Sequence, residues 1–155
     1  MLKKLGLVSI ATAFVLSTAL FAKEDKGAKN SGERNGETVF SESCAVCHAN
    51  KNIPETLHFG DPNDWKDLIE EGQQFPSAHG WVGTRKMPRH GGDPKITLSE
   101  FISAVAYMAN NSGVKMEKPW KEGPDIDKDT YNEILKEIQI RLQRNELYDK
   151  IGKKY

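Results

Sequence analysis

The most regular pattern of hydrophobic and polar positions lies between Thr97 and Gly113. Its apolar residues recur at steps of three and four, which places them on one face of an α-helix: Leu98, Phe101, Ile102, Val105 and Met108. Thr97 and Glu100 have the spacing of a capping box, and Gly113 is typical of a residue that follows a helix end. The pattern therefore predicts a helix with a well-defined core face.

Two shorter helices are predicted before this one. Asp61 followed by Pro62 is typical of a capped helix start, and this helix is expected to end at Gly72. A short amphipathic segment over residues 33–43 carries apolar residues that lead toward Cys44. No segment alternates apolar and polar residues as a half-buried strand does, so the sequence predicts an all-α domain.

Composition limits the size of this domain and the class of its partners. The chain has 155 residues, of which 37% are hydrophobic and 28% charged, values typical of a globular protein with one modest core. Lys and Arg number 22, as do Asp and Glu, so the formal net charge is zero. A chain without excess positive charge is not expected to bind nucleic acid through bulk electrostatics.

The N-terminus has the composition of a secretory signal peptide. Two lysines precede an uncharged apolar run over residues 5–21, and a polar segment begins after Ala22. We predict a signal peptide over residues 1–22, cleaved after Ala22, and a flexible leader over residues 23–34. An uncleaved membrane anchor is the alternative, although the run is just shorter than the roughly 18 to 20 apolar residues that span a bilayer.

The two cysteines stand three residues apart and a histidine follows the second, in the order Cys44-Ala45-Val46-Cys47-His48. Such a pair is typical of a redox dithiol, half of a zinc site, or covalent attachment of haem. Zinc would need two more ligands, and the sequence has no second pair of this spacing. A redox dithiol is expected beside strands in a βαβ pattern. We therefore predict one haem c per chain, bonded to both cysteines, with the histidine below its iron.

A second axial ligand is expected downstream of this motif. Met87 lies in a segment rich in Gly and Arg, where a loop can bring its thioether to the iron. Met108 belongs to the apolar helix face and Met116 to a charged stretch, so neither is preferred. We predict Met87 as the ligand, and a bis-histidine iron with His79 or His90 is the alternative.

With these residues in place, the chain resembles a class I c-type cytochrome of the bacterial periplasm. The resemblance covers residues 35–111 and rests on Gly36 and Phe40 before the motif, on the motif itself, and on Tyr107 in the last helix. It implies that Gly36 lets the first helix cross the last one closely, and that the aromatic rings lock the crossing. It also implies the histidine of the motif and Met87 as proximal and distal iron ligands.

The resemblance implies further contacts to the cofactor. Pro54 stands in the loop after the motif, where a proline carbonyl accepts the second imidazole N–H in this family. Trp81, Arg85 and Lys86 are candidates to bind the haem propionates, because buried carboxylates need donors or cations. The residues predicted to bind the cofactor are thus Cys44, Cys47, His48, Met87, Pro54, Trp81 and Arg85.

A haem iron with both axial positions filled has no place for a substrate, so the sequence predicts a periplasmic electron carrier and not an enzyme. It would pass single electrons from a dehydrogenase or quinol-oxidising complex to a terminal acceptor. A basic group near the predicted ligand favours redox partners with an acidic docking surface: Arg85, Lys86, Arg89 and Lys95. If Met87 does not bind the iron, a gas sensor or a peroxide-reactive protein is the alternative.

The chain continues beyond the segment that resembles the family. We predict a haem domain over residues 35–113, a linker over 114–124 and a C-terminal extension over 125–155. Thr130 and Glu133 are expected to open a helix in this extension. Its predicted apolar stripe is Tyr131, Leu135, Ile138 and Leu142. The helix is expected either to pack on the haem domain or to dock a partner subunit, as in a larger periplasmic oxidoreductase such as a molybdenum enzyme.

Overall fold

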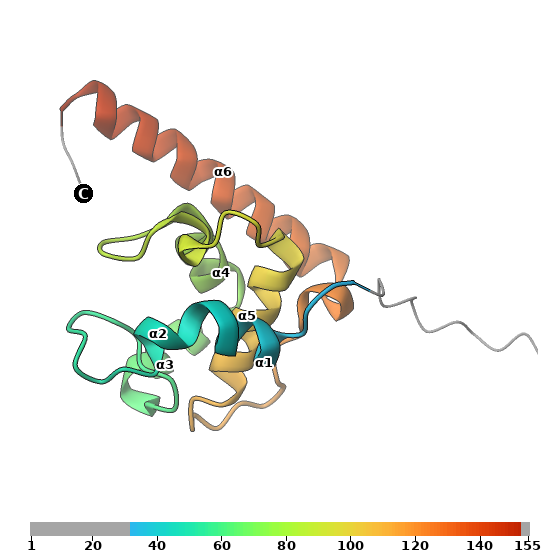
Figure 1. Ribbon diagram of the computed structural model, residues 1–155. Helices are drawn as coiled ribbons and strands as arrows, with labels where there is room; N and C mark the ends of the chain where they lie inside the picture. Colours follow the sequence, from blue (N-terminus) through green and yellow to red (C-terminus); the bar gives the residue numbers. More distant parts are fainter. Residues whose placement is uncertain (1–31, 153–155) are drawn as a thin grey trace, which may run out of the picture.

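The fold is built from helices joined by turns. The computed structural model describes residues 32–152, so the predicted signal peptide (1–22) and the leader up to residue 31 lie outside the described residues. In chain order the elements are α1 (Gly36–Val39), the π-helix η1 (Phe40–Cys44), α2 (Ala45–His48), α3 (Pro62–Glu71), α4 (Gln74–Val82), the 3₁₀-helix η2 (Arg89–Gly92), α5 (Leu98–Asn110), the 3₁₀-helix η3 (Gly123–Asp125) and α6 (Lys128–Lys150) (Figure 1). No β-strand occurs between residues 32 and 152, which confirms the all-α prediction. Over the same range, no helix combines the length and the apolar character needed to cross a membrane.

The first helices form one continuous run that ends at the cysteine motif. Asn35 caps α1, because its side chain accepts a hydrogen bond from the Thr38 N–H. Between α1 and α2 the run widens into a π-turn, in which the Ala45 N–H donates to the Phe40 carbonyl five residues earlier. The helix therefore begins later than the sequence indicated and continues through the whole motif.

Helix α1 crosses α5 so closely that only glycine fits at position 36. A Cβ atom at Gly36 would overlap the Ser103 carbonyl group of α5 and would lie 2.8 Å from the Tyr107 Cβ atom. Beside the crossing, the rings of Phe40, Phe59 and Tyr107 pack against one another, with centroids 4.5 to 5.6 Å apart. The crossing implied by the family resemblance is confirmed, and Phe59 is a third ring that the sequence did not indicate.

The two helices with the strongest sequence signals form where they were expected. Helix α3 begins after Asp61, whose side chain accepts from the Asn63 N–H, and ends at Gly72. Helix α5 has the predicted capping box between Thr97 and Glu100. Together they close a core whose buried side chains include Val39, Phe40, Cys44, Trp65, Ile96, Phe101, Val105 and Met108.

Helix α4 has no counterpart among the predicted helices. It begins without a side-chain cap, carries Pro76 in its first turn and contains Gly80, and both residue types weaken a helix signal. It packs against α5 and α6 in a second core cluster: Ala78, Val82, Ile102, Ile134 and Ile138. Partly buried side chains surround this cluster: Trp81, Leu98, Ile126, Tyr131 and Leu142.

The C-terminal helix α6 packs back on this second cluster, which is the first of the two arrangements expected for it (Figure 1). It begins after the Asp127 cap, before the start predicted at Thr130. The predicted stripe is wrong at one position, because Ile134 and Ile138 are buried whereas Leu135 is 42% exposed. Ile134 lies four residues before Ile138 and shares its face of the helix, and Leu135 is turned away from that face.

The segment between α5 and α6 is fastened to the rest of the fold. The Gln73 side chain donates to the Lys121 carbonyl at 2.7 Å and accepts from the Lys121 N–H at 3.3 Å. Farther along, the Gly123 N–H donates to the Ser103 hydroxyl at 2.9 Å. Helix α6 therefore starts from a point that is held against both α4 and α5.

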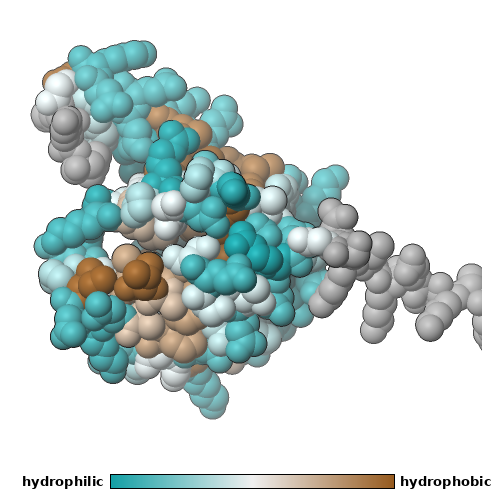
Figure 2. All heavy atoms as spheres, in the orientation of Figure 1, coloured by the Kyte–Doolittle hydropathy of each residue, from teal (hydrophilic) through white to brown (hydrophobic). Residues whose placement is uncertain are grey.

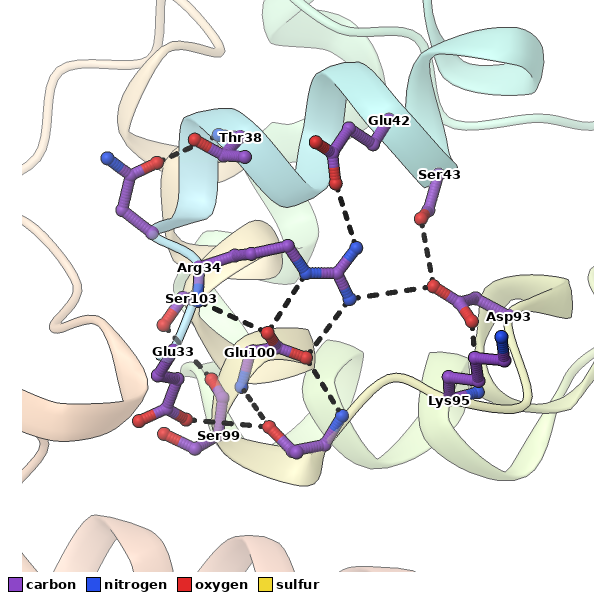
Figure 3. Close-up of polar contacts among 12 residues, drawn as sticks. Glu33, Arg34, Thr38, Glu42, Ser43, Asp93, Lys95, Ser99, Glu100 and Ser103 are labelled. Atoms are coloured by element: carbon purple, nitrogen blue, oxygen red, sulfur yellow. Dashed lines mark hydrogen bonds and ion pairs between the residues drawn. The ribbon is translucent and has the colours of Figure 1, made fainter. Parts of the chain in front are cut away.

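Arg34 ties the segment before α1 to the start of α5 (Figure 3). Its guanidinium donates to both carboxylate oxygens of Glu100, at 2.9 and 3.0 Å, and to Glu42 at 2.9 Å. Asp93 lies 3.5 Å from the same guanidinium and accepts from the Ser43 hydroxyl at 3.1 Å. The prediction of a flexible leader over 23–34 is therefore wrong for Arg34, which is fixed by these contacts.

The ion pair between Arg34 and Glu100 makes the stability of the fold depend on pH in the acid range. Hydrogen bonds from Arg34 lower the pKa of Glu100 to about 2, from an ordinary value of 4.5. The folded state thus favours the charged carboxylate, so the contribution is complete above pH 4.5 and is lost as the pH falls toward 2. We predict that Glu100→Gln lowers the free energy of unfolding at pH 7 by about 2 kcal/mol and flattens its decline in this acid range.

Chemical unfolding followed by circular dichroism at several pH values measures both effects. Glu42→Gln is the matched control, because the Glu42 side chain is 54% exposed and contributes only one hydrogen bond to the same guanidinium. If Glu100→Gln loses stability in acid as steeply as the wild type does, the pH dependence does not come from Glu100.

A second prediction concerns the crossing of α1 and α5. Gly36→Ala should destabilise the fold by about 1 to 3 kcal/mol, or prevent folding, because the added methyl group forces the two backbones apart. Gly32→Ala is the control, since nothing lies within 4 Å of a Cβ atom built at that position. Urea unfolding compares the two variants, and equal midpoints would show that the crossing does not require glycine.

Candidate functional site

The cysteine motif occupies the end of the first helical run. Cys44 is the last residue of η1, whereas Cys47 and His48 end α2. Cys44 is buried against the core, Cys47 is exposed, and both are free thiols. The motif therefore offers one thiol from inside the fold and one from its surface.

His48 is 7% exposed, and its ring is oriented by the backbone. Its Nδ1 atom lies 2.6 Å from the Leu57 carbonyl oxygen, so Nδ1–H donates and the Nε2 lone pair is left to bind a metal. Burial lowers the pKa of His48, which also favours the neutral ring. A second hydrogen bond, from the Phe59 N–H to the His48 carbonyl at 2.7 Å, holds the same loop in place.

The backbone carbonyl that orients the His48 ring is not the one predicted. Pro54 was predicted to supply the acceptor, but the carbonyl at Nδ1 is that of Leu57, three residues farther along the loop. Every residue carries a backbone carbonyl, so no side-chain pattern marks the one that faces the ring. The orienting role predicted for Pro54 therefore belongs to Leu57.

The surroundings of the motif suit a large apolar group bonded to sulfur. Burial raises the pKa of the Cys44 thiol to about 11, so the buried sulfur is uncharged, as a thioether sulfur also is. Val46, between the two cysteines, is 75% exposed, and Figure 2 shows hydrophobic surface beside α2. An uncharged buried sulfur and hydrophobic surface beside the same helix are compatible with a bound haem.

Met87 lies in a tight turn closed by its own backbone. The Thr84 N–H donates to the Met87 carbonyl at 3.1 Å, and the Met87 N–H donates back to Thr84 at 2.9 Å. Arg85, at the exposed tip, has a φ of +52°. The Met87 side chain packs on the core cluster that contains Cys44, and a Cβ atom at Gly80 would lie 3.2 Å from its methyl carbon. The structure thus brings Met87 to the same core as the motif, on a turn instead of a helix.

His79 and His90, the two histidines predicted as alternative iron ligands, have different surroundings from Met87. His79 lies on α4 and faces a cleft beside Arg141 of α6; burial, aided by the charge of Arg141, lowers the pKa of His79 to about 4. His90 packs its ring on Trp81, with centroids 4.0 Å apart, and Trp81 contacts Phe101 edge-to-face at 5.7 Å. Trp81 is therefore part of the packing beneath the Met87 turn.

Known proteins named cytochrome c-555 are similar to this chain. The relative from Chlorobaculum thiosulfatiphilum is 35% identical over 81 residues, which are 50% of this chain and 93% of the relative. The chain belongs to the class I c-type cytochromes. Cytochromes c-555 from Prosthecochloris aestuarii and Chlorobaculum tepidum are 34% and 33% identical to this cytochrome, and the matches cover 84% and 74% of their lengths. No sequence model of a protein family matches the chain.

Among solved structures, this cytochrome is similar to a chain from a crystal structure of an electron transfer complex of nitrite reductase with cytochrome c. That chain is 28% identical, with a TM-score of 0.47, and the likeness covers 50% of this cytochrome and 93% of that chain. Each likeness covers about half of this cytochrome, so about half of its residues lie outside the matched segment.

Membership of the family explains the arrangement of the cysteines and the histidine in the motif. Class I c-type cytochromes are electron carriers with covalently attached haem c, and the spacing of Cys44, Cys47 and His48 is that of such an attachment motif. The residues around the motif agree with this cofactor, because they supply two thiols, a neutral oriented imidazole and an open apolar surface.

Proposed function

We propose that this cytochrome carries single electrons between redox proteins of the periplasm on one haem c, held by Cys44, Cys47, His48 and Met87. The observation that carries the proposal is the His48 ring, whose Nδ1 is committed to the Leu57 carbonyl at 2.6 Å so that Nε2 is left for iron. When bound, the haem supplies an iron that gains and loses one electron.

Cys44 and Cys47 would form the two thioether bonds. The haem would supply two vinyl groups, and each thiol would add across one of them with no atom expelled and no oxidant needed. Cys44 would bond from the buried side and Cys47 from the exposed side of α2. The helix would then hold the cofactor at two points with His48 directly after the second.

Met87 is the proposed second axial ligand. Its position on a turn closed by two hydrogen bonds, and its packing on the Cys44 cluster, support this role. A thioether ligand raises the reduction potential. If His48 and Met87 both held the iron, they would leave no place on it for a substrate or a diatomic gas, as expected of an electron carrier.

The core formed by η1, α3 and α5 would keep water from the site. Phe40, Trp65, Phe101 and Val105 are at most 8% exposed. An apolar surrounding controls solvent access and dielectric, and through them the reduction potential. These side chains would therefore help to set the potential without touching the iron.

We propose that redox partners have acidic surfaces, which dock on a basic group of this cytochrome near the Met87 turn. The basic group consists of Arg85, Lys86, Arg89 and Lys95. Lys86 lies 3.7 Å from Glu55, which offsets part of its charge, and both side chains are exposed. Exposed charges of this kind increase the rate of encounter, and the effect weakens as salt is added.

The boundaries proposed from the sequence are a haem domain over 35–113, a linker over 114–124 and an extension over 125–155, after a signal peptide over 1–22. The contacts of Gln73 with Lys121 support a linker that is packed on the haem domain. The apolar face of α6 already packs on α4, so this face is not open to a partner subunit.

The ligand assignment predicts an optical signature. The ferric protein should show the weak far-red charge-transfer band of methionine sulfur on haem iron, and Met87→Ala should lose the band and lower the potential. Met116→Ala is the matched control, because Met116 lies in the charged segment after Gly113. Absence of the band in the wild type would exclude Met87 and direct the search to His79 and His90.

The attachment proposal predicts a covalent adduct. The denatured wild-type chain should carry the whole mass of one haem, since addition of a thiol to a vinyl group expels nothing. The double variant Cys44→Ala/Cys47→Ala should carry none after denaturation, whereas Val46→Ala, at the exposed position between them, should keep the adduct. Mass spectrometry of denatured protein measures this, and haem retained by the double variant would refute the attachment sites.

A further inference from the structure

A cleft of about 530 Å³ opens between α4, the turn of residues 84–87 and the C-terminal half of α6. Its lining includes His79 from α4, Arg141 and Arg144 from α6, and Met87 of the turn, but not Cys44, Cys47 or His48 of the haem motif. The volume is in the range of small-molecule sites in proteins. The cleft is therefore a recess separate from the cysteine motif.

The lining of this cleft is strongly basic. Four arginines from three segments meet there: Arg85 of the turn, Arg89 of η2, and Arg141 and Arg144 of α6. Asp149 is the one carboxylate among the lining residues. The lining therefore carries more positive than negative charge, even though Glu137, which is not a lining residue, offsets Arg141 at 2.8 Å.

Two buried nitrogen atoms at the cleft also lack hydrogen-bond partners. They are His79 Nε2 and Arg141 Nε, and neither is paired with any group between residues 32 and 152. Arg141 uses another of its nitrogens to bind Glu137, at 2.8 Å. A buried polar atom without a partner costs free energy, and both of these atoms belong to side chains that line the cleft.

We propose that this cleft binds a small oxyanion of the phosphate or sulfate class. Such an ion presents several negatively charged acceptor oxygens, and the planar fork of arginine donors matches two of them at once. Arg141 and Arg144 would approach it from α6, and Arg85 and Arg89 from the opposite wall. Met87 lines the same cleft and Arg85 is also a predicted haem contact, so the ion would lie beside the proposed haem site.

A bound oxyanion would also hold α6 against the turn. The buried residues of α6 are Ile134 and Ile138, both in its first half, whereas Leu147 is 56% exposed. The second half of the helix thus lies beside the turn without a buried apolar anchor. An ion bridging Arg144 to Arg85 would join this half to the segment that carries Met87.

The test is isothermal titration calorimetry of the haem-loaded cytochrome with sodium phosphate and sodium sulfate. Sodium chloride keeps the ionic strength constant, so that a general salt effect is not counted as binding. The wild type should show one saturable site. Arg144→Gln should weaken it by about tenfold or more, and Asp149→Asn should strengthen it several-fold.

Lys136→Gln is the matched control, because Lys136 lies on the same helix, is 67% exposed and pairs with Glu133 outside the cleft. It should bind as the wild type does. The proposal is overturned if the wild type shows no saturable binding, if Arg144→Gln binds normally, or if Lys136→Gln weakens binding equally. Binding of an acidic peptide without binding of phosphate or sulfate would also overturn it in favour of a protein-docking surface.

The optical spectrum separates this proposal from the ligand assignment. Arg144 is exposed and is not among the residues proposed to hold the haem, so Arg144→Gln should keep the wild-type far-red band while it loses the oxyanion. Loss of the band in this variant would show that Arg144 acts on the haem site and not on a separate anion site.

Discussion

The close approach of α1 to α5 is the constraint on which the site depends. The backbone of Gly36 lies against the Ser103 carbonyl, where no side chain fits. This contact fixes the direction of the first helical run, and the run delivers Cys44, Cys47 and His48 at its far end. The ring cluster of Phe40, Phe59 and Tyr107 and the Arg34 network then fasten the run on two sides.

The loop after the motif completes the orientation of the imidazole. Leu57 accepts from His48 Nδ1 and Phe59 donates to the His48 carbonyl, so two backbone hydrogen bonds hold the ring and its helix end together. Phe59 also belongs to the aromatic cluster at the α1–α5 crossing. The crossing and the ring orientation are therefore linked through a single short loop.

Sequence reasoning succeeded where the signal is local. The Thr97–Glu100 capping box and the cysteine motif are each written in a few adjacent residues, and α5 formed where its pattern predicted. It failed where tertiary packing decides: α4 forms despite Pro76 and Gly80 because α5 and α6 bury its apolar face. The acceptor for His48 is a backbone carbonyl, which leaves no mark in the sequence. Met87, Trp81 and Arg85 remain predictions as cofactor contacts, because their roles depend on a group outside the chain.

The π-turn between α1 and α2 makes the length of this segment as important as its composition. The turn holds one residue more than a regular α-helical turn. If residues 36–48 wound as a regular α-helix of the same length, the motif would rotate by about 100° about the axis and His48 would be directed away from Leu57. Removing one residue from 41–43 would compensate for the loss of the π-turn, because a regular helix would then present the motif on the present side. The number of residues in this segment and the π-turn are therefore coupled, and a change in one requires a change in the other.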